Sequence, residues 1–382
     1  MTSGGPNTNA GPPGRTAIVV VDDSPVQRRF VRAAIEAGPE FTVVGEARNG
    51  KEAVALVARL KPAAVLMDLD LPVMSGIEAI ERIMASNPTP ILVYSAHVNG
   101  EETANALEAL AAGAVDVLAK PQPGDTGSLE DYADQLRKRL RVASRIRVIT
   151  HPRGKLRPGH AVASSVSAPA ATAGERPRAA SRPVVSHELE AKQGIKLIAI
   201  GASTGGPQAL HTVLRALPDD LDQAVLVVQH MADGFIPGLV SWLDQLVPLP
   251  VVVGGSGRRL APGTITVAPS GANLLVQDVR MRVVCVAPDP GQFHVPGIDQ
   301  CFASIADAMG PDAVGVLLTG MGRDGAAGLK QMRDRGATTL GQDEATSTVY
   351  GMPQAAHALD AVDKQLPIEQ IAPTLLGLVG RP

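Results

Sequence analysis

AIVVVDDSP (residues 17–25) has the form of a strand that ends in two carboxylates and passes directly into a helix. The run Ala17–Val21 is short, apolar and β-branched, which is typical of a parallel strand buried on both faces. Ser24 and Pro25 are residue types favoured at the cap and first position of a helix, and we expect that helix over Val26–Ala37. The stretch therefore predicts one β–α unit of a parallel sheet.

The same alternation continues along the first third of the chain. Four further apolar runs predict strands, at Thr42–Gly45, Ala64–Met67, Ile91–Tyr94 and Val115–Ala119. Amphipathic, alanine-rich segments separate them, so the strands are expected to be parallel and joined by helices. This region therefore predicts a doubly wound, five-stranded parallel α/β domain, whose ligands bind at the carboxyl ends of the strands.

Chemically active side chains follow those strands. Asp22 and Asp23 come after the first, Asp68 after the third, Ser95 after the fourth and Lys120 after the fifth. Clustered carboxylates repel one another unless a hard cation lies among them, and Mg²⁺ prefers oxygen ligands. The serine and lysine suit a phosphoryl group beside that ion. Each residue could instead be a solvated loop residue, but five independent placements at strand ends argue against that alternative.

The last half of the chain shows a similar pattern with different side chains. Buried strands are predicted at Ile195–Ile200, Ala224–Val228 and Ala313–Leu318. Ser203, His230 and Asp324 follow them in that order. If the strands are parallel neighbours in one mostly parallel, doubly wound sheet, the three side chains meet at one edge. That is the minimum geometry for base-assisted attack by a serine hydroxyl.

The local sequence supports this nucleophile. Gly201-x-Ser203-x-Gly205 is a small-residue turn similar to a nucleophile elbow. The helix expected over Pro207–Leu217 would direct free N–H groups towards the serine, where an oxyanion could form. The order serine, histidine, aspartate differs from that of ordinary α/β-hydrolases, in which the aspartate precedes the histidine.

Each of these assignments has an alternative. The glycine-rich turn could bind phosphate, although it lacks the G-x-G-x-x-G spacing and a Walker lysine. His230 could be a core histidine, and Asp324 could cap the helix expected over Gly325–Arg335. Three other histidines are weaker candidates for a base, because they lie in a helix or follow no strand: His211, His294 and His357.

Composition separates these regions and argues against several classes of protein. Residues 146–193, rich in Pro, Ala, Ser, Gly and Arg, predict a flexible linker between domains at 15–145 and 194–382, and residues 1–14 predict a disordered N-terminus. A net charge of −3 and 2% aromatic residues disfavour nucleic-acid binding. Cys285 and Cys301 have no zinc or disulfide spacing. Without a signal peptide or membrane-length apolar run, we expect a cytoplasmic protein with no direct membrane insertion.

The first domain resembles the response-regulator receiver family. The matching segments are VVDDS (Val20–Ser24), MDLDLPVMSG (Met67–Gly76), YSA (Tyr94–Ala96) and AKP (Ala119–Pro121). The resemblance implies that a sensor histidine kinase phosphorylates Asp68. It also implies that Mg²⁺ binds Asp22, Asp23, Asp68 and the backbone carbonyl of Asp70, and that Ser95 and Lys120 contact the phosphoryl group. Val117 stands where the family commonly has a switch aromatic, whereas Leu71 and Ser75 are mild departures.

The second domain resembles the catalytic domain of the chemotaxis protein-glutamate methylesterases (CheB). The segments are IGASTGGPQAL (Ile200–Leu210), VVQHM (Val227–Met231), LTGMGRDGAAGL (Leu318–Leu329) and GQDEATSTVYGMP (Gly341–Pro353). The resemblance implies Ser203 as nucleophile, His230 as general base and Asp324 as the residue that orients it. Thr204 and the backbone of Met321 would support the oxyanion. Asn273 and Gly297 replace common histidine and serine residues, which could alter substrate contacts or receiver packing.

This second resemblance implies a function. The substrates would be glutamyl γ-methyl esters of methyl-accepting chemotaxis receptors, and some relatives also deamidate receptor glutamines. The kinase partner would be of the chemotaxis type, the esterase domain would need no cofactor, and phosphorylation of Asp68 would loosen the receiver from the active site. Three alternatives stay open: a non-catalytic phospho-switch that binds partner proteins, a nucleotide-binding output domain and, least favoured, a DNA-binding output domain.

Overall fold

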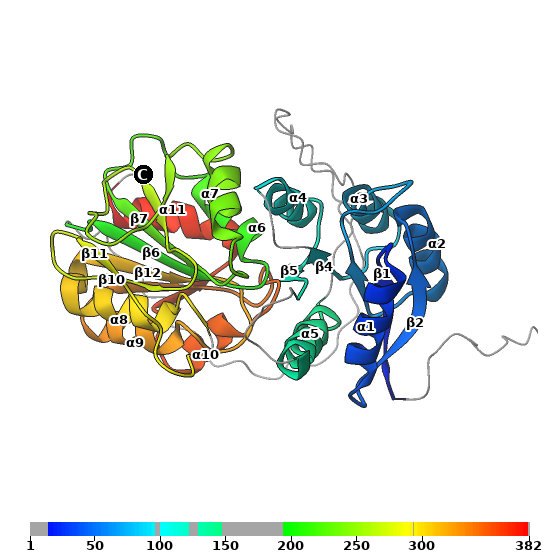
Figure 1. Ribbon diagram of the computed structural model, residues 1–382. Coiled ribbons are helices and arrows are strands. Elements are labelled where there is room, and N and C mark those ends of the chain that lie inside the picture. The colour runs from blue at the N-terminus through cyan, green and yellow to red at the C-terminus, as the bar shows by residue number, and fades with distance from the viewer. Residues whose placement is uncertain (1–13, 96–99, 122–128, 147–193, 293, 381–382) are drawn as a thin grey trace, which may run out of the picture.

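The structure has two α/β domains that lie next to each other, each built on a sheet of parallel strands (Figure 1). The computed structural model describes residues 14–95, 100–121, 129–146, 194–292 and 294–380. The predicted linker, residues 146–193, and the predicted disordered N-terminus, residues 1–14, fall almost wholly outside these ranges. No helix in the described part of the chain is both long and apolar enough to cross a membrane.

The N-terminal domain is the predicted five-stranded parallel sheet, with strand order β2-β1-β3-β4-β5. Its strands are β1 (Thr16–Val21), β2 (Phe41–Ala47), β3 (Ala64–Met67), β4 (Ile91–Ser95) and β5 (Asp116–Ala119). Its helices are α1 (Pro25–Glu36), α2 (Gly50–Leu60), α3 (Gly76–Ser86), α4 (Gly100–Ala111) and α5 (Leu129–Ala143). The side chain of Ser24 accepts a hydrogen bond from the Gln27 N–H at the start of α1, which confirms the predicted cap.

The C-terminal domain is built on a seven-stranded sheet with order β14-β13-β12-β6-β7-β9-β8, in which all the paired strands are parallel. Its strands are β6 (Leu197–Ala202), β7 (Ala224–Gln229), β8 (Val251–Val253), β9 (Ile265–Val267), β12 (Ala313–Leu317), β13 (Thr338–Gln342) and β14 (Lys364–Leu366). An antiparallel hairpin, β10 (Asn273–Val276) and β11 (Val283–Val286), lies outside this sheet. The doubly wound, mostly parallel fold expected from the sequence is confirmed.

Helices flank this second sheet, and a short 3-10 turn directly precedes β12. They are α6 (Gly206–Leu214), α7 (Ile236–Asp244), α8 (Ile298–Met309), η1 (Gly310–Asp312), α9 (Ala326–Asp334), α10 (Met352–Ala358) and α11 (Ile368–Leu378). Strand β6 runs two residues further than predicted, because Gly201 and Ala202 still pair with Val228 and Gln229 of β7. The extended pairing brings Ser203 to the edge of the sheet, directly beside the end of β7.

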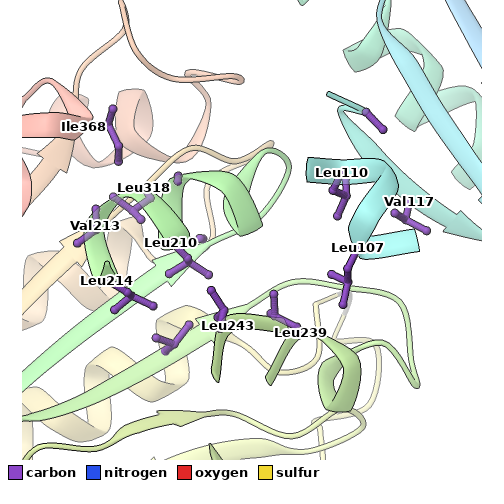
Figure 2. Packing of buried hydrophobic residues seen from close by; sticks show 14 of the residues in the cluster. Leu107, Leu110, Val117, Leu210, Val213, Leu214, Leu239, Leu243, Leu318 and Ile368 are labelled. Carbon is purple, nitrogen blue, oxygen red and sulfur yellow. The ribbon is translucent and has the colours of Figure 1, made fainter. Parts of the chain in front are cut away.

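The two domains meet through helix α4 of the first and helices α6 and α7 of the second. Figure 2 shows Leu107 of α4 directed towards Leu239 of α7, and both belong to one buried apolar cluster that extends into both domains. Gly238 permits this approach, since a Cβ added there would lie 2.2 Å from Cγ2 of Thr103. The contact places strands β4 and β5 of the first sheet beside the second domain, where Asp116 of β5 reaches Thr204 after β6 (Figure 1).

Candidate active site and phosphoacceptor site

Ser203 follows β6 directly and is held by its backbone. Its N–H donates to the carbonyl of Thr319 at 3.0 Å, and its own carbonyl accepts from the Gly206 N–H at 2.7 Å. Gly205 has a φ of +75°, a left-handed conformation that glycine adopts without strain. The predicted small-residue turn between strand and helix is therefore present, and Ser203 is buried in it.

His230 lies beside this turn, because its N–H donates to the carbonyl of Ala202 at 3.0 Å. The buried side chain of Gln229 ties the two segments together: its Nε2 donates to the carbonyls of both Ser203, at 2.9 Å, and His230, at 2.8 Å. Sequence reasoning passed over Gln229, although it directly precedes the histidine in the VVQHM segment. One side-chain amide thus sets the separation of the predicted nucleophile and base.

Asp324 pairs with His230 across 2.8 Å, from Oδ2 to Nε2 of the imidazole. The same carboxylate accepts the N–H groups of Ile298 and Asp299, at 2.9 and 3.0 Å, so it caps the start of α8. Burial acts to raise the pKa of Asp324, but the hydrogen bonds from His230 and these backbone donors outweigh it and lower the pKa to about 2. The capping alternative named a different helix: Asp324 caps α8, whereas α9 has Gly325 as its N-cap, and near α9 Asp324 accepts only the Gly325 N–H, at 3.0 Å.

This carboxylate decides which nitrogen of His230 can act as a base. An ionised carboxylate only accepts hydrogen bonds, so Nε2 of His230 must be the donor and Nδ1 the acceptor. Nδ1 is buried and has no hydrogen-bond partner among the described residues. The hydrogen bond from the Ser203 hydroxyl to this nitrogen is therefore not formed in the present arrangement of the two domains.

The predicted oxyanion groups lie nearby but differ in their contacts. Met321 lines the same cavity as Ser203, Thr204 and His230. The carbonyl of Thr204 accepts a hydrogen bond from the Thr319 hydroxyl at 3.0 Å. The hydroxyl of Thr204 donates to Oδ2 of Asp116, in the N-terminal domain, at 3.2 Å. Gly320 also lies close to Ser203, since a Cβ added at Gly320 would lie 2.7 Å from the Cβ of Ser203.

A cavity of about 340 Å³ connects the three predicted catalytic segments with the N-terminal domain. Asp116, Lys138 and Arg139 line it from β5 and α5. Arg139 pairs with Asp116 at 2.7 Å, and Asp116 in turn accepts from Thr204. The first domain therefore closes part of the active-site edge with charged side chains.

His294 lies on this cavity too, against the sequence-based expectation. Its ring stacks on that of His230, with centroids 4.3 Å apart and planes 4° apart. The residue belongs to the loop before α8 and follows no strand, so neither periodicity nor the strand-end rule could place it. Its only signal was the position three residues before Gly297, which starts the helix that Asp324 caps.

Asn273 and Gly297, the two departures from the family pattern, contact each other rather than the cavity. Asn273 is buried, and its Oδ1 accepts from the Gly297 N–H at 2.7 Å. Its amide also pairs with that of Gln292, at 2.8 and 2.9 Å. These residues anchor the loop that carries His294 and are not among those that line the cavity.

The first domain holds a second cluster at the carboxyl ends of its strands. One oxygen from each of Asp22, Asp23 and Asp68 lies within 4.8 Å of the others. Lys120 bridges two of them, with Nζ 2.9 Å from Asp22 and 2.7 Å from Asp68. Burial raises the pKa of Asp68 to about 6 despite the opposing effect of the lysine. Three clustered carboxylate oxygens are typical of a Mg²⁺ site of the receiver kind.

The remaining predicted switch residues surround that cluster. Ser95 is buried at the end of β4, and its carbonyl accepts from the Lys120 N–H at 2.8 Å. Val117 is buried in β5. The aromatic ring near the lysine comes from Tyr94 of β4 instead, with Lys120 Nζ 5.2 Å from its centroid. Asp70 is exposed on the loop after β3.

Both domains match known protein families. The profile of the CheB methylesterase family matches residues 198–375, and that of the response regulator receiver domain matches residues 18–129. The protein-glutamate methylesterase/protein-glutamine glutaminase 3 of Paramagnetospirillum magneticum is 39% identical, over 96% of this chain and 97% of its own. The protein-glutamate methylesterase/protein-glutamine glutaminase of Moorella thermoacetica is 37% identical, over 95% and 98%.

A solved structure is also similar. The CheB methylesterase catalytic domain of Thermotoga maritima is 31% identical, with a TM-score of 0.47, over 48% of this chain and 98% of that one. The fold and the two strand-end clusters define a response regulator whose receiver is joined to a parallel α/β domain with serine, histidine and aspartate at its edge. The chain belongs to the CheB methylesterase family.

Proposed function

We propose that Ser203, His230 and Asp324 hydrolyse glutamyl γ-methyl esters on chemotaxis receptors, under control of phosphorylation at Asp68. The chain is a protein-glutamate methylesterase and protein-glutamine glutaminase regulated by its receiver domain, as the names of its relatives and the matches of both domains support. The observation that carries the residue assignment is the 2.8 Å contact between His230 and Asp324, which leaves Nδ1 of the histidine as an acceptor.

In the proposed reaction, the Ser203 hydroxyl attacks the ester carbonyl while Nδ1 of His230 accepts its proton. Backbone N–H groups at the start of α6 and near Met321 stabilise the tetrahedral oxyanion, and each such donor is typically worth about 2.7–4 kcal/mol. The imidazolium then returns its proton to the leaving methanol, and water hydrolyses the acyl-serine by the same steps. A glutamine amide passes through the same intermediate and releases ammonia.

The proposed regulation rests on the contacts of the receiver with the active-site edge. An α-helix with its side chains is about 10–12 Å across, and a receptor helix would not fit a cavity of about 340 Å³ that the receiver partly encloses. Ser203 and Nδ1 of His230 are also not hydrogen-bonded here. Phosphorylation would loosen the receiver, open the edge to a receptor helix and let this hydrogen bond form.

The phosphorylation site follows from the acidic cluster. Asp22, Asp23, Asp68 and the backbone carbonyl of Asp70 would hold Mg²⁺, which when bound neutralises charge on the incoming phosphoryl group. Lys120 and Ser95 would contact the phosphoryl oxygens, and Lys120 would exchange its present contact with Asp68 for one with phosphate. The phosphodonor would be a sensor histidine kinase of the chemotaxis type.

Release of methanol from methylated receptor membranes, with and without a small phosphodonor, tests the proposed function. We expect Ser203→Ala to lose nearly all activity while its thermal unfolding stays close to that of the wild type. Ser241→Ala is the matched control, because Ser241 is exposed on α7. Activity of Ser203→Ala near the wild-type level would remove this serine from the mechanism.

A further inference from the structure

One hydrogen bond holds the edge of the His230 ring but not its plane. Nε2 is fixed by Asp324 at 2.8 Å, and the backbone N–H is fixed by Ala202 at 3.0 Å. The imidazole can still tilt about the Nε2–carboxylate contact, and a tilt moves the lone pair of Nδ1 away from Ser203. A general base works only when that lone pair is directed at the proton it accepts.

The ring of His294 covers one face of this imidazole. The centroids are 4.3 Å apart and the planes are within 4° of parallel, so the two rings form a stack rather than an edge contact. A parallel neighbour at this distance blocks rotation of His230 towards that face.

The loop around His294 is fixed on both sides. On one side, the Gln292 side chain donates to the His294 carbonyl at 2.6 Å and pairs with the buried amide of Asn273. On the other side, Asn273 accepts from the Gly297 N–H at the start of α8. Helix α8 also binds Asp324 through its first N–H groups. The stacked ring and the carboxylate are therefore positioned by the same helix end.

The electrostatics of the pair suit a base that becomes a cation. Burial, with the nearby His230 as second cause, lowers the pKa of His294 to about 4. His294 is therefore neutral near pH 7, and its ring offers a π face to the imidazolium that forms when His230 takes the serine proton. A second cation at 4.3 Å would repel that imidazolium instead.

We propose that His294 is a positioning residue of the esterase: its stacked ring sets the plane of the His230 imidazole so that Nδ1 faces Ser203. The inference rests on the proposed function, because it assigns His230 as the general base. It requires the flat ring of His294 and not its nitrogen atoms, which makes it distinct from a proton relay.

The test uses the full-length chain, activated with a small phosphodonor, and measures kcat and KM for methanol release from methylated receptors. We expect His294→Ala to lower kcat about tenfold, the scale of an aromatic pair, with KM changed less than about twofold. His294→Phe keeps a flat ring without nitrogen atoms and should recover most of kcat. Gln292→Ala, which loosens the loop while keeping both histidines, should lower kcat in the same direction. His357→Ala, at an exposed position on α10, is the matched control.

Each result bears on the proposal. Wild-type kcat in His294→Ala would overturn it, as would an equal loss in the Ala and Phe variants, which would require the imidazole nitrogens. A rise in KM without a fall in kcat would show substrate contact instead. Thermal unfolding of each variant separates these results from a general loss of folding. If wild type and Ser203→Ala released methanol equally, the proposed function would fail, whereas a wild-type kcat in His294→Ala with an inactive Ser203→Ala would defeat this inference alone.

Discussion

The hydroxyl of Thr204, in the catalytic domain, donates a hydrogen bond to Oδ2 of Asp116, in the receiver, across 3.2 Å. Thr204 directly follows the proposed nucleophile, and Asp116 is the first residue of β5. Arg139 holds the same carboxylate oxygen at 2.7 Å. The receiver therefore binds a hydroxyl that we expect to support the oxyanion, in addition to lining the cavity beside Ser203.

This contact predicts that Asp116→Ala raises the activity of the unphosphorylated protein. A single hydrogen bond contributes about 1 kcal/mol net, and a change of that size in the equilibrium between closed and open domains corresponds to about fivefold. Activity in the presence of a saturating phosphodonor should change little. Methanol release measured without phosphodonor checks this, with Glu130→Ala, exposed at the start of α5, as control. Unchanged basal activity would show that Asp116 does not stabilise the closed state.

The phosphoacceptor assignment predicts different outcomes for two nearby aspartates. Asp68→Asn should abolish the gain of esterase activity with a small phosphodonor, because the buried carboxylate nucleophile is lost. Asp70→Asn should retain that gain, since only the backbone carbonyl of Asp70 is assigned to Mg²⁺ and the substitution keeps it. Activation ratios of the two variants and wild type, measured in parallel, decide the point. A full response in Asp68→Asn would place the switch elsewhere.

The raised pKa of Asp68 predicts a dependence of stability on pH. Its folded-state pKa of about 6 lies above its ordinary value of 3.8, so the folded chain binds this proton more tightly than the unfolded chain does. The contribution of Asp68 to the free energy of unfolding therefore falls as pH rises between these two values, by up to about 3 kcal/mol at 1.36 kcal/mol per unit.

Without Mg²⁺, Asp68→Asn should unfold at a higher temperature than wild type at about pH 7.5, and this excess should shrink at about pH 4.5, where the wild-type carboxyl is protonated in the folded state. Thermal unfolding followed by circular dichroism checks the difference, with the exposed Asp70→Asn as control. An excess that does not vary with pH would contradict the assigned shift. Added Mg²⁺ should stabilise wild type more than Asp68→Asn, because a ligand stabilises the state that binds it.

Strand periodicity and strand ends located most of both sites. Asp22, Asp68 and Lys120 come together because parallel strands share a carboxyl edge, and the same rule brought His230 to Asp324. His294 was missed because a loop residue has no period, and its place depends on side-chain pairing between Asn273 and Gln292. The contact of Thr204 with Asp116 was missed for another reason: docking of two domains depends on the fit of their surfaces, which no local pattern encodes.

Gly320 provides a last test of how closely the serine must be placed. A Cβ added at this position would lie 2.2 Å from Sδ of Met352 and 2.7 Å from the Cβ of Ser203. The end of the methionine can move aside, but the serine Cβ is tied to the turn after β6 and must shift with its backbone. Misplacement of reacting groups by about 1 Å can cost about 100-fold in rate, and we expect kcat of Gly320→Ala to fall by that order.

Gly377→Ala is the matched control, because a Cβ added there would meet nothing within 4 Å beyond the local backbone of its own helix, α11. This substitution should leave kcat unchanged and stabilise the fold slightly, since alanine favours a helix by about 0.5–1 kcal/mol over glycine. Turnover of methylated receptor by phosphodonor-activated protein, measured beside thermal unfolding, compares the two variants. A wild-type rate in Gly320→Ala would mean that the Ser203 hydroxyl can reach the ester even when its backbone is displaced. The tight placement of Ser203 between the ends of β6 and β12 would then not be needed for catalysis.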